Sequence, residues 1–113
     1  MSHRPDKLIA DMIAAAEAIA AFTAGRIRTD YDRDLMLRSA VERQFEILGE
    51  ALRRLELLSP ALAARISEHR RIIDFRNLIA HGYDAIDSDI VWQVVHDKLP
   101  TLLAETRQIL ADL

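Results

Sequence analysis

Apolar residues recur at three- and four-residue spacing near the start of the chain, which predicts an amphipathic helix. Pro5 suits the first turn of this helix, because an N–H at that position would have no partner within the helix. Gly25 stands near its expected end. The apolar stripe consists of Leu8, Ile9, Met12, Ile13, Ala16, Ile19 and Ala20.

A second, longer stripe follows the polar segment GRIRTDYD, residues 25–32, which we interpret as a connection. The helix is predicted to start between Asp30 and Asp34. Its spacing is close to a heptad pattern. The stripe consists of Leu37, Val41, Phe45, Leu48, Leu52 and Leu55.

Three further helices are predicted in the second half. Ser59 and Pro60 are typical of a helix start, and open a short helix through about Ser67. The next helix is expected to stop at Gly82 and carries Ile72, Ile73, Phe75, Leu78 and Ile79. The last helix, capped by Asp87 or Ser88, carries Ile90, Val91, Val94, Val95, Leu99, Leu102, Leu103, Ile109 and Leu110.

These elements predict an all-α fold, an antiparallel bundle of four to five helices in one domain spanning residues 1–113. Pro100 should kink or interrupt the last helix, because proline removes a backbone donor and clashes with the preceding turn. The apolar faces are wide enough to supply a core and part of a dimer interface.

Composition narrows the possible functions. The chain has no cysteine, which excludes a disulfide framework and a thiolate metal site. We find neither a signal peptide nor an apolar run long enough to span a membrane, so we expect a cytoplasmic protein with no membrane contact. A formal charge of −3 argues against coating nucleic acid by bulk electrostatics. Positive charge concentrates in the middle of the chain, and solvated helix faces are its simplest explanation. The residues concerned are Arg53, Arg54, Arg65, Arg70, Arg71 and Arg76.

The segment DFRNLIAHGYD, residues 74–84, gathers polar side chains beside a helix end. In one regular helix Arg76 and His81 would lie roughly 140° apart with about 7.5 Å of rise between them, on different faces. Two arrangements could unite them: a loosened helix end at Gly82, or a second subunit. Asn77 lies four residues before His81 and can orient its ring.

These residue types could together catalyse a reaction. The partial negative charge of a helix C-terminus favours a protonated His81, which can exchange protons near neutral pH. The guanidinium of Arg76 matches phosphate oxygens and the charge of a phosphoryl transition state. Together they could cleave RNA without a metal, because RNA supplies its own 2′-hydroxyl nucleophile. The structural alternative is that His81 caps helix carbonyls and Arg76 makes a surface ion pair.

Three blocks of sequence resemble HEPN-domain proteins, specifically the HepT-like toxins. RNLIAHGYD matches the Arg-x4-His-x-Tyr motif, with Arg76, His81 and Tyr83. EILGEALRRL is similar to the family's Gly-Glu-Ala helix, and IVWQVVHDKLPTLLAE resembles its final helix, with its Trp and its Leu-Pro pair. Many relatives carry a Pro-Trp pair before the motif helix, where this chain has SEHRR, residues 67–71.

The resemblance implies a dimer with two motifs across a shared cleft. It implies a metal-independent endoribonuclease without a cofactor, the toxin of a type II toxin–antitoxin system acting on RNA such as tRNA or mRNA. A nucleotidyltransferase antitoxin would silence it by transferring AMP to Tyr83. In this interpretation Arg76 and His81 are catalytic, and Asn77 supports them.

Glu50 is a further candidate for the site. Gly49 and Ala51 allow another helix to approach, so Glu50 could hold an arginine of the motif helix. The Glu42–Glu46–Glu50 ladder lacks the histidines of a di-iron site, and no metal ligand is predicted. Two other functions stay open: a non-catalytic helical module that binds a nucleotide or a nucleotidyltransferase, and a purely structural helical dimer. Cleavage of RNA would indicate the ribonuclease, whereas nucleotide binding without cleavage would indicate the non-catalytic module.

Overall fold

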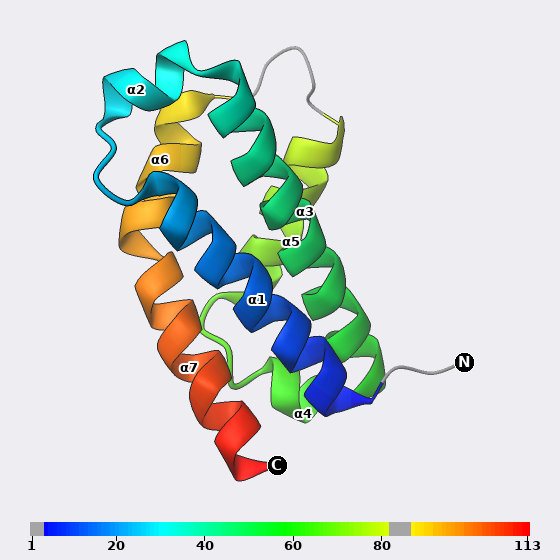
Figure 1. The fold of residues 1–113 in the computed structure, drawn as a ribbon. Helices are drawn as coiled ribbons and strands as arrows, with labels where there is room; N and C mark the ends of the chain where they lie inside the picture. Colours follow the sequence, from blue (N-terminus) through cyan, green and yellow to red (C-terminus); the bar gives the residue numbers. More distant parts are fainter. Residues whose placement is uncertain (1–3, 82–86) are drawn as a thin grey trace.

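The computed structural model describes residues 4–81 and 87–113, and within them the chain forms seven helices and no strand (Figure 1). The helices are α1 Pro5–Thr23, α2 Arg28–Arg33, α3 Leu35–Leu58, α4 Pro60–Ala63, α5 His69–His81, α6 Ser88–Asp97 and α7 Leu99–Asp112. This confirms the all-α fold. Within the described ranges, no helix combines the length and apolar character needed to cross a bilayer.

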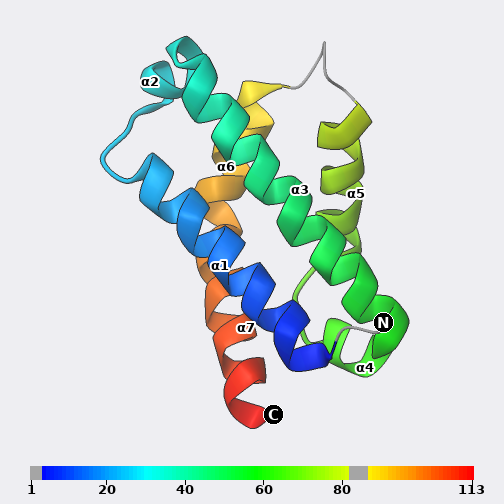
Figure 2. The same cartoon turned by 45° about the vertical axis from the view of Figure 1, so that its right-hand side comes forward.

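In the bundle α3 lies between α1 and α5 (Figure 2). α6 and α7 lie behind α1 in this view, with α7 packed on α1 and α6 packed on α2. Most of α1 packs on α3 and α7, whereas α5 packs closely on α3. The two expected long apolar stripes face one another in the core. The largest fully buried aliphatic side chains there include Ile9, Met12, Ile19, Leu48, Leu52, Leu55, Ile66 and Ile109.

Local capping fixes where several helices begin. The carboxylate of Asp34 accepts a hydrogen bond from the Leu37 amide at 3.0 Å, and the Ser59 hydroxyl accepts one from Leu62 at 3.4 Å. Asp87 is the cap of α6, because its carboxylate accepts from the Asp89 amide at 2.8 Å. These side chains satisfy amides that the helices leave without an internal partner.

The last helix is interrupted before Pro100, as expected. α6 ends at Asp97, and α7 begins at Leu99 with Pro100 in its first turn. The amide of Lys98 still donates to the carbonyl of Val94, so the break is confined to a single junction. The short helix after Ser59 is shorter than predicted, since it ends at Ala63 rather than near Ser67.

The segment interpreted as a polar connection contains helix α2, so that interpretation was wrong. Tyr31 is fully buried in it, with its ring centroid 5.5 Å from that of Trp92 on α6. Arg28 also pairs with Asp89 of α6. A six-residue helix is too short to show a period, and its one buried aromatic ring is held by a partner far along the chain. Tertiary contact therefore stabilises α2.

The hydroxyl of Tyr31 is buried and finds no hydrogen-bond partner among the described residues. Burial is the main reason why the pKa of this phenol is raised, and Glu42 adds to it. We predict that Tyr31→Phe stabilises the protein by about 1 kcal/mol, because an unpaired buried hydroxyl is removed. Urea unfolding of the variant and of wild type measures the difference in their free energies of unfolding.

Tyr31→Ala is the matched control, and should lower the free energy of unfolding by about 3–5 kcal/mol through the cavity that it leaves. A loss of stability in Tyr31→Phe would show instead that the hydroxyl has a partner in solution.

Candidate functional site

The candidate site begins where α5 crosses α3 at Gly49. A Cβ atom built on Gly49 would lie 2.2 Å from the Cβ of Arg76 and 2.6 Å from its Cγ. Real Cβ atoms do not approach so closely, so the stem of Arg76 occupies the space that a side chain at position 49 would need. The predicted close approach of another helix at Gly49 is present, and the group that uses it is Arg76.

The guanidinium of Arg76 is held by two neighbours. Its Nη1 donates to Oδ1 of Asn77 at 2.9 Å, and its Nη2 lies 3.4 Å from Oε1 of Glu50. Nε is buried and has no partner among the described residues. The side chain is 27% exposed, so the group is anchored yet accessible from solvent.

Glu50 forms ion pairs with three arginines. Arg53 donates to both carboxylate oxygens at 3.0 Å, and Arg54 donates to Oε2 at 3.0 Å. These two lie one turn further along α3 than Glu50, whereas Arg76 reaches it from α5. The hydrogen bond from Arg53 is the main reason why the pKa of Glu50 falls to about 2, with Arg54 and the charge of Arg76 also lowering it. Glu50 is therefore ionised at neutral pH.

The remaining predicted residues lie on the same helix or just beyond it. Position 81 is the last residue of α5, and Asn77 precedes it by one turn of continuous helix. The side chain of His81 and the whole of Tyr83 lie outside the described residues.

The side chain of Arg76 crosses Gly49, donates to Asn77 of its own helix and pairs with Glu50 of α3. Its relation to the His81 side chain, and with it the choice between a loosened helix end and a second subunit, lies outside the described residues.

A shallow depression of about 230 Å³ lies beside this cluster. Arg76, Glu50 and Arg54 line it together with Arg43 and Glu46. Arg43 pairs with Glu46 at 3.5 Å. Leu8 and Asp11 of α1 and Ile47 and Ala51 of α3 complete the lining. The depression therefore lies among α1, α3 and α5 and combines side chains of both charges with apolar ones.

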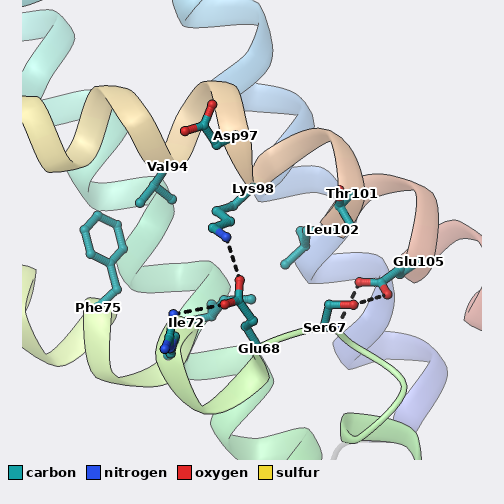
Figure 3. Close-up of a pocket in the computed structure, with 11 residues that line it drawn as sticks. Ser67, Glu68, Ile72, Phe75, Val94, Asp97, Lys98, Thr101, Leu102 and Glu105 are labelled. Atoms are coloured by element: carbon teal, nitrogen blue, oxygen red, sulfur yellow. Dashed lines mark hydrogen bonds and ion pairs between the residues drawn. The ribbon is translucent and has the colours of Figure 1, made fainter.

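A second cavity, of about 270 Å³, opens between α5 and the junction of α6 and α7 (Figure 3). Its floor includes Ile72, Phe75 and Leu102, and Glu68 pairs with Lys98 across its rim at 2.7 Å. None of the predicted site residues lines it. Among the described residues, no group of three or more histidines, aspartates or glutamates is arranged to hold a metal ion.

We predict that Gly49→Ala destabilises the protein by about 1–3 kcal/mol, because the new methyl group overlaps Arg76 and forces α5 outward. Helix propensity alone would give the opposite sign, a gain of about 1 kcal/mol. Thermal unfolding followed by circular dichroism separates the two effects. Ser39→Ala, at an exposed position of the same helix, is the control and should be neutral or slightly stabilising.

Glu50→Gln should lower the free energy of unfolding by about 1 kcal/mol at pH 7, a modest value because Arg53 and Arg54 are nearly half exposed to solvent. A carboxyl with a depressed pKa stabilises the fold above its ordinary pKa of 4.5, and loses that contribution as the pH falls toward 2. The difference from wild type should therefore shrink with acidification. Glu17→Gln, which removes an exposed pair with Arg107, should show little effect at any pH.

The sequence matches the model of a known protein family over most of its length. The family is described as "Ribonuclease HepT-like", and the match covers residues 12–109. No solved structure matches this chain significantly.

Curated relatives come from Methanocaldococcus jannaschii. "Putative RNase MJ1380" is 27% identical over 106 residues, which cover 93% of this chain and 96% of the relative. "Gamma-glutamylcyclotransferase and putative RNase MJ0434" is 26% identical over 102 residues, 90% of this chain but 46% of the relative. This chain thus spans less than half of that second protein. With the family match over residues 12–109, these relatives lead to one conclusion: the chain belongs to the ribonuclease HepT-like family, an all-helical HEPN fold.

Proposed function

We propose that this protein is a metal-independent endoribonuclease, the toxin of a type II toxin–antitoxin system, acting as a homodimer. Arg76 and His81 are its catalytic residues, with RNA as substrate and tRNA or mRNA as the candidate targets. Membership of a ribonuclease family and relatives named as RNases support RNA cleavage. The toxin role, the dimer and the residue assignments are our proposal.

The observation that carries the proposal is the position of Arg76. Its stem passes over Gly49, and its guanidinium is held between Glu50 and Asn77, one helical turn before His81. Holding the guanidinium in advance reduces the loss of side-chain entropy when it binds phosphate. The guanidinium is planar, and the side chain that carries it is 27% exposed and lines the depression beside Glu50.

The proposed reaction uses a nucleophile within the RNA. The imidazole of His81 takes the proton of a ribose 2′-hydroxyl, and the 2′ oxygen forms a bond to the adjacent phosphorus. The bond from phosphorus to the 5′ oxygen breaks, and that oxygen receives a proton from an imidazolium. Arg76 stabilises the negative charge on the phosphorane oxygens. The products are a 2′,3′-cyclic phosphate and a 5′-hydroxyl end.

Asn77 and Glu50 are positioning residues in this scheme. Asn77 accepts a hydrogen bond from Arg76 and occupies the position that faces residue 81 along α5. Glu50 keeps Arg76 directed across α3, and its low pKa means that it does so throughout the working pH range. A glutamine at position 50 would keep the size but weaken the charge-assisted contact.

We propose that control of the activity acts at Tyr83. A nucleotidyltransferase antitoxin would transfer AMP to its hydroxyl, two residues after His81. The added phosphate would repel RNA from the adjacent site, and the added base would obstruct it. In the proposed homodimer the second copy supplies another motif to the same cleft. Partly exposed Leu78 and Ile90 add apolar surface on α5 and α6 for such a contact.

The test is cleavage of total RNA and of tRNA by purified protein in EDTA. We expect wild type to cleave and to leave 2′,3′-cyclic phosphate ends. Arg76→Ala should lower kcat/KM by about 10²–10³-fold, because it removes transition-state stabilisation. His81→Ala should lower it by about 10²–10⁴-fold. Circular dichroism must show that both variants are folded.

Intact mass is measured first, since protein carrying AMP on Tyr83 would be falsely inactive. Tyr83→Phe, which cannot accept AMP, provides an unmodified reference. Undiminished cleavage by His81→Ala would refute the mechanism. Absence of cleavage by folded, unmodified dimer would favour the non-catalytic module that binds a nucleotide or a nucleotidyltransferase.

A further inference from the structure

A third depression, of about 490 Å³, lies between the end of α1 and the junction of α6 and α7 (Figure 1). It shares no lining residue with the depression beside Glu50 or with the cavity next to α5. Its volume falls within the range of small-molecule sites, about 300–1,000 Å³. The depression is therefore separate from the candidate catalytic surface and large enough for a ligand of its own.

The two walls of this depression differ in side-chain size. Val95, Leu99 and Leu103 form an aliphatic wall contributed by α6 and α7. Ala20 and Ala24, at the end of α1, are exposed and contribute only methyl groups to the other wall. The small residues leave room in front of the aliphatic wall, so that a flat apolar group could lie against it.

The titratable side chains that line the depression are all basic, namely Arg26, His96 and Arg107. Each arginine has a carboxylate partner that does not line it. Nη1 of Arg26 lies 3.7 Å from Oδ2 of Asp34, and Nη2 of Arg107 donates to Oε2 of Glu17 at 3.3 Å. Each of these long contacts engages one nitrogen of a guanidinium that has five N–H donors, so the same group can also bind an anion in the depression.

Local contacts fix the positions of two of the basic groups. Gly25 has a φ of +72°, a conformation that glycine adopts without strain, and the amide of Arg26 donates to the carbonyl of Thr23 at 3.0 Å in this turn. Nδ1 of His96 lies 2.9 Å from the carbonyl oxygen of Trp92, and the two rings are 4.5 Å apart. Because a carbonyl only accepts, Nδ1 carries a proton, and Nε2 is left for a ligand.

We infer that this depression binds a nucleoside monophosphate, with the phosphate held by Arg26, His96 and Arg107 and the base lying against the aliphatic wall. Guanidinium groups match phosphate oxygens in a planar, paired geometry. Nε2 of His96 can donate to a phosphate oxygen when the imidazole is protonated, and accept from a protonated phosphate when it is neutral.

The combination of the two walls selects this class of ligand. Inorganic phosphate would use the basic groups but leave the aliphatic wall in water, whereas a nucleoside would use the wall but leave the basic groups without an anion. A nucleoside monophosphate uses both. No step of the proposed RNA cleavage involves this site, so the inference does not depend on the proposed function.

The experiment is calorimetric titration of the purified protein with AMP and with UMP at pH 7, and with adenosine and inorganic phosphate as separate probes. We expect the nucleotides to bind at least about tenfold more tightly than adenosine or phosphate. Arg26→Ala and Arg107→Ala should each weaken nucleotide binding about tenfold, because a charged hydrogen bond to phosphate is lost. Arg65→Ala, which removes an arginine paired with Asp112 elsewhere on the fold, should leave it unchanged.

A second variant fills the depression and keeps its basic groups. Ala20→Leu places a larger side chain at an exposed helical position that lines the depression, and should weaken nucleotide binding at least about tenfold without unfolding the protein. Ala14→Leu is the matched control, because Ala14 is exposed on the same helix and lines none of the three depressions. Circular dichroism checks that both variants are folded.

Failure of folded wild type to bind either nucleotide would overturn the inference, and so would equal affinity for AMP and inorganic phosphate. Loss of nucleotide binding in Arg76→Ala but not in Arg26→Ala would also overturn it, because the ligand would then lie in the depression beside Glu50. Cleavage is a separate measurement. Arg26→Ala should cleave RNA as wild type does, and failure of wild type to cleave RNA would refute the proposed function without affecting this site.

Discussion

The close crossing of α3 and α5 at Gly49 is the contact on which the candidate site depends. α5 packs closely on α3, and the stem of Arg76 fills the space where any other residue at position 49 would place its side chain. The crossing thus sets two things at once, the separation of the helices and the path of the arginine. A larger residue at position 49 would change both, so packing and site geometry cannot vary independently.

The charge at Glu50 follows from this packing. Because the side chain of Arg76 crosses α3 at Gly49, its guanidinium lies with those of Arg53 and Arg54 around the carboxylate of Glu50. Hydrogen bonds from Arg53 and Arg54 and the charge of Arg76 lower the pKa of this carboxyl. Partial solvent exposure limits the contribution of these ion pairs to the stability of the fold.

The two faces of α5 have different characters. On one side Arg76 pairs with Glu50 of α3 and donates to Asn77 of its own helix. Toward α6 and α7, Ile72 and Phe75 line a more apolar cavity whose rim charges are paired with one another. In our proposal the RNA is cleaved on the charged surface and not at the apolar cavity. It also explains why neighbouring arginines, such as Arg70 and Arg71, reach different environments.

The sequence by itself determined the long helices, the helix caps and the break before Pro100, because periodicity, capping and proline geometry are local. It also indicated Gly49 and Glu50 as a place where another helix approaches. Only the tertiary structure decided that α2 exists, since Tyr31 is buried against Trp92, far away in the chain. It likewise decided where the Arg76 guanidinium lies, because a flexible side chain crosses a neighbouring helix and helical spacing alone cannot predict that path.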